Sequence, residues 1–175
     1  MIVRTAHTHQ LDPAVLDAAH ALLVAVFAGE LDRSDWDNCL GGIHALAYDG
    51  DELIGHGAVI QRRLLHAGRS LRAGYVEGVG VRADRRREGV AGAVMEALEG
   101  VIDRAYDVGA LGSTNEGLPF YTSRGWRVWE GPLRVMTPEG VLDTPQESGW
   151  ILVFGGAVHV GYELICADFR DGDVW

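Results

Sequence analysis

The sequence predicts a mixed α/β (α+β) fold, in which a mostly antiparallel sheet is flanked by helices. Three apolar strand-like runs follow one another between residues 43 and 81, separated by an Asp-Gly turn and an Ala-Gly-Arg turn. Helical apolar patterns precede and follow this block. With 175 residues, of which 47% are hydrophobic, the chain is expected to form a single domain spanning residues 1–175.

Near the amino terminus, the pattern predicts a strand followed by two helices. Ile2–Thr5 could form the strand, and Pro13–Phe27 the first helix, with Asp12 as N-cap and proline at the first helical position. Ser34 or Asp35 can cap a short second helix that continues through residue 40 and ends at two glycines. The three strands of the meander are then expected at Ile43–Tyr48, Glu52–Arg63 and Leu71–Val81.

An amphipathic helix of about four turns is expected after the meander. Its apolar stripe consists of Val90, Val94, Leu98, Val101 and Ala105, while Glu96, Glu99 and Asp103 lie off that stripe. Three arginines and a glycine stand at its start. A helix start exposes unpaired N–H groups, and glycine lets a ligand approach the backbone closely, so we expect a phosphate-binding turn here.

The charge is unevenly distributed along the chain. The formal net charge is −10, yet the segment from residue 62 to residue 87 carries eight arginines against two acidic residues and is net +6. An acidic protein with one basic segment is a poor general nucleic-acid binder, because its field repels the phosphate backbone. A small polyanion and a separate cationic partner fit better, although the acidic excess could also serve solubility alone.

Cysteines, histidines and apolar runs exclude several other classes of protein. Cys39 and Cys166 have no framework spacing and are expected to be reduced, mostly buried thiols of a cytoplasmic protein. The pair His7 and His9 lacks further ligands, so no metal is expected. The apolar run at residues 21–28 has no basic flank and is far shorter than a membrane span, so neither a signal peptide nor a membrane partner is expected.

The hexapeptide at residues 86–91 has the form R-x-x-G-x-A at a strand-to-helix turn. It resembles the pyrophosphate loop of the Gcn5-related N-acetyltransferases (GNAT), which bind acetyl-coenzyme A. GYVEGVGV precedes the loop, and a strand candidate at Ala110–Thr114 and FYTSRGW follow, similar to the family's later motifs. The resemblance implies the GNAT acyl-CoA N-acyltransferase fold with splayed central strands. It also implies acetyl-CoA contacts by Val79, Val81, Arg86, Arg87, Glu88, Gly89, Val90 and Ala91.

A narrower resemblance extends over nearly the whole chain. FAGEL, SDW, LGGIHAL, AVIQRRL, GYVEGVGVRAD, YTSRGW and the terminal DGDVW look like the aminoglycoside 2'-N-acetyltransferases, in the same order. This resemblance implies acetyl-CoA-dependent N-acetylation of the aminoglycoside 2'-amino group by direct transfer in a ternary complex, and with it antibiotic resistance. Members of this kind are often dimers, so a homodimer is expected.

Three residues are candidates for the chemistry of acetyl transfer. Glu77 is a charge in an apolar strand, and it either accepts the amine proton or pairs with Arg72 or Arg82. The resemblance assigns Glu77 to the amine, acting through water. It also makes Tyr121 the acid that protonates the leaving thiolate, and the Val79 N–H the donor to the thioester oxygen; Tyr121 could instead be a core tyrosine.

Acidic side chains are expected to bind the cationic acceptor. The resemblance implies a substrate site formed by Glu30, Asp35, Glu77, Gly78, Asp173 and Trp175. The terminal carboxylate of Trp175 is a second candidate for relaying the proton. A chain end frays by default, but a terminal tryptophan ring is costly to leave in water, which favours a docked tail.

Three other functions remain open from the sequence. The acceptor could be an endogenous amine, such as a polyamine, a cell-wall amino sugar or a protein N-terminus. The protein could also be a non-catalytic acyl-CoA-binding module, which has no need of Glu77 or Tyr121. Nucleic-acid binding through the arginine-rich segment is disfavoured by the overall charge.

Overall fold

The computed structural model describes residues 1–170 and 172–175. These residues form two compact units, which we call unit 1 (Met1–Ile60 and Val76–Val101) and unit 2 (Gln61–Tyr75 and Ile102–Trp175). Strands β3 (Glu52–His66) and β4 (Arg69–Val81) and helix α3 (Val90–Ala105) each contribute residues to both units. The expectation of a single domain stays a prediction.

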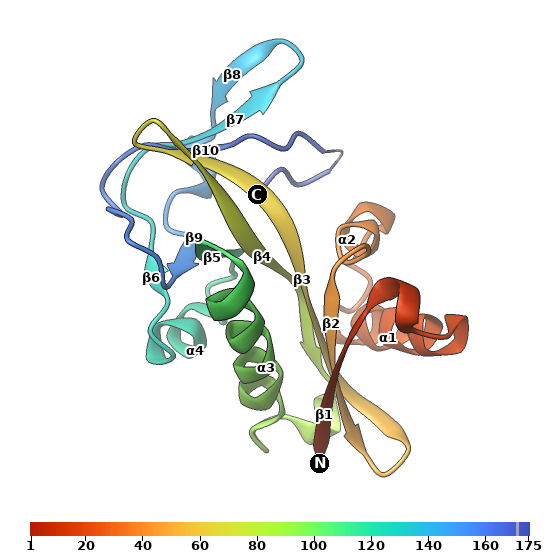
Figure 1. Ribbon diagram of the computed structural model, residues 1–175. Coiled ribbons are helices and arrows are strands. Elements are labelled where there is room, and N and C mark those ends of the chain that lie inside the picture. The colour runs from red at the N-terminus through yellow and green to blue at the C-terminus, as the bar shows by residue number, and fades with distance from the viewer. Residues whose placement is uncertain (171) are drawn as a thin grey trace. The chain divides into compact units, whose positions relative to one another are not determined.

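Unit 1 contains the amino-terminal strands and the longer helices. Besides its parts of β3, β4 and α3, its elements are β1 (Ile2–His7), η1 (Thr8–Gln10), α1 (Pro13–Val26), α2 (Arg33–Asp37), β2 (Ile43–Asp49) and η2 (Ala83–Arg85). β1 pairs antiparallel with β2, and β2 pairs antiparallel with β3. Arg82 N donates to Ile54 O at 3.0 Å, so β4 still lies beside β3 at its end. Helices α1 and α2 cover one face of these strands and α3 the other (Figure 1).

Glycines in β3 let α3 approach the sheet closely. A Cβ atom added to Gly55 would lie 2.7 Å from Val90, and one added to Gly57 would lie 2.9 Å from Val94 and 3.0 Å from Leu98. All three helix residues are buried, with exposed fractions of 0–2%. The helix therefore packs almost directly on the backbone of β3, which fixes where its first turn begins.

The strands of the meander and the helix that begins at Val90 are confirmed, with three corrections in detail. The N-cap of α2 is Asp32 rather than Ser34 or Asp35, and the helix ends at Asp37. Asp12 is the N-cap of α1, but its side chain makes no capping hydrogen bond. In α3, the buried stripe continues through Met95 and Ile102, while Val101 is only half-buried and Ala105 is exposed.

Unit 2 contains the carboxy-terminal strands. Besides its parts of β3, β4 and α3, its elements are β5 (Val108–Gly112), α4 (Leu118–Ser123), β6 (Arg127–Val128), β7 (Leu133–Thr137), β8 (Gly140–Asp143), η3 (Pro145–Glu147), β9 (Ile151–Phe154) and β10 (Leu164–Cys166). The strand order is β6-β9-β5-β4-β3-β10-β7-β8. The pairings β4–β5 and β10–β7 are parallel, and β5–β9, β6–β9, β7–β8 and β3–β10 are antiparallel. The predicted mixed, mostly antiparallel sheet is confirmed, although β5 begins and ends two residues earlier than expected.

Aromatic rings fill much of the core of unit 2. Tyr75, Trp129 and Trp175 are 1%, 1% and 4% exposed and pack in one cluster with apolar residues of β5, β7, β9 and β10. Trp129 also donates from Nε1 to Tyr162 O at 3.0 Å. Both cysteines are free and buried, as expected. No helix of the described chain is long and apolar enough to cross a membrane.

Candidate active site

Strand β4 carries a kink at Gly78. Its φ of +56° lies in the left-handed region, where a side chain is strained. A Cβ atom there would also lie 2.6 Å from Cys39 Sγ and 3.0 Å from Leu23 Cδ1. Only glycine therefore fits at this position. Glu77 and Val79 flank the kink on either side, and both are half-buried.

The two arginines considered as ion-pair partners of Glu77 have carboxylate partners of their own. Arg72 Nη2 lies 3.1 Å from Asp107 Oδ1 within unit 2. Arg82 Nε lies 2.7 Å from Asp84 Oδ1 within unit 1. Each of these two arginines therefore contacts at least one carboxylate other than that of Glu77.

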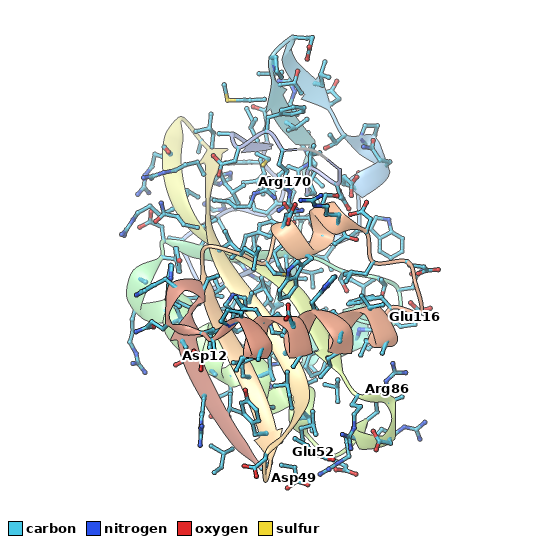
Figure 2. All side chains as sticks on the ribbon, turned by 90° about the vertical axis from the view of Figure 1, so that its right-hand side faces the viewer. Asp12, Asp49, Glu52, Arg86, Glu116 and Arg170 are labelled. Atoms are coloured by element: carbon cyan, nitrogen blue, oxygen red, sulfur yellow. The ribbon has the colours of Figure 1, made fainter. Side chains whose placement is uncertain are left out.

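Acidic side chains engage the first arginine of the triplet ahead of α3. Arg85 Nη2 lies 2.7 Å from Asp49 Oδ2, and Arg85 Nε lies 2.9 Å from Glu88 Oε2. The Arg85 guanidinium holds the pKa of the Asp49 carboxyl below its usual range. Asp49 stands at the tip of the β2–β3 hairpin, and Arg86 lies on the loop that leads into α3 (Figure 2). Arg85 therefore braces this loop against the hairpin.

Arg86 and Arg87, by contrast, are exposed, and neither forms an ion pair with any described residue. The backbone around them opens toward solvent: Arg87 has φ of +65°, Gly89 has φ of +82°, and a Cβ atom on Gly89 would meet nothing within 4 Å. A backbone hydrogen bond from Ala93 N to Gly89 O, at 3.0 Å, marks the first turn of α3. The unpaired N–H groups at the start of α3 carry the partial positive charge of the helix. This loop fits a diphosphate, with two cations and a backbone free of side-chain obstruction.

The remaining residues predicted to contact the cofactor divide by burial. Val81 and Val90 are 9% and 2% exposed, so both residues are buried. The Glu88 carboxylate pairs with Arg85, which gives it a structural contact. Ala91 is half-buried in the first turn of α3.

Two predicted substrate-binding acids lie in unit 1. Glu30 is exposed in the segment between α1 and α2. Asp35 takes part in a capping box: its Oδ2 accepts from Asp32 N at 2.9 Å, and its N donates to Asp32 Oδ1 at 3.0 Å. The Asp35 carboxylate is therefore held in place by the helix start that it helps to cap.

Tyr121 lies on α4 in unit 2, between two aromatic rings. Its ring contacts Phe120 at 5.1 Å and Trp126 at 6.2 Å between centroids, both edge-on. Burial raises the pKa of Tyr121 to about 12. The hydroxyl is therefore protonated at neutral pH and can act as a hydrogen-bond or proton donor.

The carboxy-terminal tail is docked on unit 2 rather than frayed. The Trp175 ring is 4% exposed, and its Nε1 donates to Thr144 Oγ1 at 2.9 Å. Arg62 Nη2 donates to Val174 O at 2.8 Å, and Arg170 Nε donates to Asp173 O at 2.7 Å. The expectation that the terminal ring is not left in water is confirmed. Asp173 itself is exposed.

Sequence reasoning missed three side chains that the structure places near these features. His44 and His56 are fully buried, and His56 Nδ1 lies 2.8 Å from Gly78 O. Arg62 is buried and donates to the tail, although from sequence it was counted only as one charge of the arginine-rich segment. His44 lies in LGGIHAL and Arg62 in AVIQRRL, so the quoted motifs held a signal for both.

Metal ligation finds no support in the arrangement of side chains. Within the described residues, no group of three or more His, Cys, Asp or Glu residues could hold a metal ion.

Comparisons with known proteins show the family to which the chain is similar. The family model described as an acetyltransferase (GNAT) domain matches residues 7–129. The aminoglycoside 2'-N-acetyltransferase of Mycolicibacterium fortuitum is 42% identical over 177 residues, which cover 98% of this chain and 91% of that protein.

Solved structures show a similar fold at low identity. Eis1 from Mycobacterium abscessus aligns with a TM-score of 0.62 and 19% identity, over 77% of this chain but only 33% of the Eis1 chain. An aminoglycoside 6'-N-acetyltransferase complexed with coenzyme A aligns with a TM-score of 0.61 and 17% identity, over 88% of this chain and 96% of that one.

Proposed function

Since this chain belongs to the Gcn5-related N-acetyltransferase family, we propose that it transfers the acetyl group of acetyl-CoA to the 2'-amino group of aminoglycosides. The observation that carries the proposal is 42% identity to an aminoglycoside 2'-N-acetyltransferase over 98% of the chain. Transfer is direct, in a ternary complex. Both cysteines are free but buried, so neither is exposed as an acyl-carrying nucleophile.

Acetyl-CoA is the co-substrate that the loop before α3 would hold. Arg86 and Arg87 would contact its diphosphate through their side chains, and the backbone around Gly89 through N–H groups. The backbones of Val79 and Val81 would contact the pantetheine arm. When bound, acetyl-CoA supplies an activated acetyl thioester; no metal takes part.

Glu77 removes the proton that the acceptor amine must lose before it can attack. Its place next to Gly78, whose φ of +56° departs from regular strand geometry, supports this role. The terminal carboxylate of Trp175 is the second candidate for this relay.

Two donors serve the acyl group. The Val79 N–H stabilises the oxygen that gains negative charge during attack. The Tyr121 hydroxyl donates a proton or a hydrogen bond to the departing sulfur, and burial keeps it protonated because its pKa is raised to about 12.

Carboxylates bind the ammonium groups of the aminoglycoside. We assign this role to Glu30, Asp35, Glu77, Asp173 and the Trp175 carboxylate, together with the backbone of Gly78. The net charge of −10 supports steering of a polycation toward the protein. The same charge argues against nucleic acid as a partner.

We further propose a cytoplasmic homodimer that confers aminoglycoside resistance on the cell that makes it. Buried free thiols at Cys39 and Cys166 support a reducing compartment. Analytical ultracentrifugation checks the oligomeric state, and growth of an expressing strain on tobramycin checks the resistance.

Thiol release from acetyl-CoA with two acceptors tests the proposed reaction. Tobramycin has a 2'-amine and amikacin has a hydroxyl at that position, so we expect turnover with tobramycin alone. The Glu77→Gln variant should reduce kcat about 10²-fold. Turnover with both drugs would keep the acetyltransferase but move the site of transfer. If neither drug were acetylated while coenzyme A still bound, the result would support an endogenous amine as acceptor or a non-catalytic acyl-CoA-binding module.

A further inference from the structure

Two buried histidines connect the kink of β4 to the amino-terminal strand. His44 on β2 and His56 on β3 are both 0% exposed, and His44 Nδ1 lies 2.9 Å from His56 Nε2. At one end of the pair, His56 Nδ1 lies 2.8 Å from Gly78 O. At the other end, His44 Nε2 lies 2.9 Å from Thr8 Oγ1. All four residues belong to unit 1.

The hydrogen-bond chain has only one direction when both imidazoles are neutral. Gly78 O can only accept, so His56 Nδ1 must carry the proton and His56 Nε2 must accept. His44 Nδ1 is then the donor to His56, and His44 Nε2 accepts from the Thr8 hydroxyl. That hydroxyl lies closer to His44 Nε2 than to Gly42 O, which is 3.3 Å away, and it accepts from Gly41 N at 2.9 Å.

Both rings are kept neutral by their surroundings. Burial lowers the pKa of both His44 and His56 to about 4. The Trp36 ring covers the pair, with centroids 6.4 Å from His44 and 6.0 Å from His56. A proton added at His56 Nε2 would oppose the N–H of His44, so the neutral pair is also the one that satisfies every bond.

The chain ends on a peptide unit with a second functional group. The Gly78 carbonyl and the Val79 N–H belong to one planar peptide unit and point in opposite directions. Fixing the carbonyl therefore fixes the direction of the N–H. A hydrogen bond accepted at the oxygen also polarises the amide and strengthens its N–H as a donor.

We propose that His56, supported by His44 and Thr8, is a positioning residue that orients and polarises the Val79 N–H through the Gly78 carbonyl. This inference rests on the proposed function, in which the Val79 N–H stabilises the developing oxyanion. His56 touches neither substrate in this role, because it acts on the far side of the peptide unit. The His56 ring lies directly beside this glycine, since a Cβ atom on Gly78 would be 3.6 Å from His56 Cε1.

Two substitutions at residue 56 distinguish the effect of the hydrogen-bond donor from the effect of side-chain volume. His56→Leu keeps the bulk but removes the donor, and we expect kcat to fall about 10²-fold with the KM for acetyl-CoA nearly unchanged. His56→Asn places an amide N–H where Nδ1 stood, and it should recover kcat to within about tenfold of the parent enzyme. His20→Leu is the matched control. It removes an imidazole that stacks on Trp36 at 5.0 Å but is not part of the hydrogen-bond chain, and it should leave kcat unchanged.

Equal kcat values for His56→Leu and His56→Asn would overturn the proposal, because packing alone would then explain the effect. A rise in KM without loss of kcat would overturn it as well. Thermal unfolding of each variant checks that the fold is retained.

NMR tests the same proposal without activity, so it remains decisive if the leucine variant fails to fold or aminoglycosides prove not to be the acceptor. In the parent protein, long-range proton–nitrogen spectra should report both His44 and His56 as Nδ1–H tautomers. The amide ¹⁵N shift of Val79 should move in His56→Leu and stay in place in His56→Asn. An Nε2–H tautomer at either histidine would contradict the chain, whatever the substrate.

Discussion

Two arginines of the same basic segment have opposite environments. Arg85 has a side chain 23% exposed and lies between two carboxylates, those of Asp49 and Glu88. Arg62 is 3% exposed and forms no ion pair with a carboxylate in residues 1–170 and 172–175. Sequence charge counts treat them alike, yet one braces a surface loop and the other supports a chain terminus.

The guanidinium of Arg62 is stabilised by dipoles and a ring instead of by a counter-charge. Its Nη2 donates to Asp168 O at 3.0 Å and to Val174 O at 2.8 Å, and it also contacts Cys166 Sγ at 2.8 Å. Its Cζ lies 4.7 Å from the centroid of the Tyr75 ring, within the range of a cation–π interaction. Breaking these contacts would leave two half-buried carbonyls without this donor, whereas an exposed ion pair is worth only about 0–1 kcal/mol.

The comparison predicts a large difference in stability between two matched substitutions. Arg62→Met should lower the free energy of unfolding by about 3 kcal/mol, because two half-buried carbonyls lose their donor and the tail loses its anchor. Arg85→Met should cost much less, because water replaces an exposed ion pair with little loss. Urea denaturation of both variants measures the difference. Similar losses would show that burial does not separate the two arginines.

The pattern of strands and helices could be predicted because it depends on local periodicity. Turn residues bound the strands between residues 43 and 81, and the spacing of apolar residues predicts α3 at Val90–Ala105. The exact ends of helices could not be predicted, because Asp32, Ser34 and Asp35 can all act as caps and only the folded backbone selects Asp32.

The site could be predicted only where a motif marks it. The kink at Gly78 and the open turn at Gly89 follow from glycines in strand and helix-start positions. The burial of Arg62 could not be predicted, because charge counts carry no information about which way a side chain points. The pairing of His44 and His56 was equally hidden, since it joins adjacent strands through tautomers that no sequence pattern specifies.

The buried histidines sharpen the comparison, because imidazole can lose its proton on burial and guanidinium cannot. The pKa of both His44 and His56 falls from 6.5 to about 4, so the unfolded chain binds protons in this window that the folded protein does not. The free energy of unfolding should therefore decrease as pH falls below 6.5, by about 2 kcal/mol for each of the two imidazoles at about pH 5.

Urea denaturation across this pH range measures that loss. The double variant His44→Gln, His56→Asn has no imidazole in the hydrogen-bond chain from Thr8 to Gly78. Its free energy of unfolding should therefore depend less steeply on pH than that of the parent protein. A parent slope no steeper than that of the double variant would mean that the pair is not neutral in the folded state, and the contrast with Arg62 would disappear.

The smallest expected effect separates the arginines of the loop itself. Arg82 is engaged by Glu52 and Asp84, whereas Arg86 is exposed and has no carboxylate partner in the described part of the chain. Arg86→Gln should raise the KM for acetyl-CoA about fivefold, equivalent to about 1 kcal/mol, and Arg82→Gln less than about twofold. Steady-state kinetics at low and high salt distinguish the two variants. Only the loss of a contact to phosphate should make KM less dependent on ionic strength. If Arg82→Gln raised KM as much as Arg86→Gln, ion pairing with carboxylates would not decide which cation serves the cofactor. The four arginines between β4 and α3 would then contribute to cofactor binding only through their summed charge.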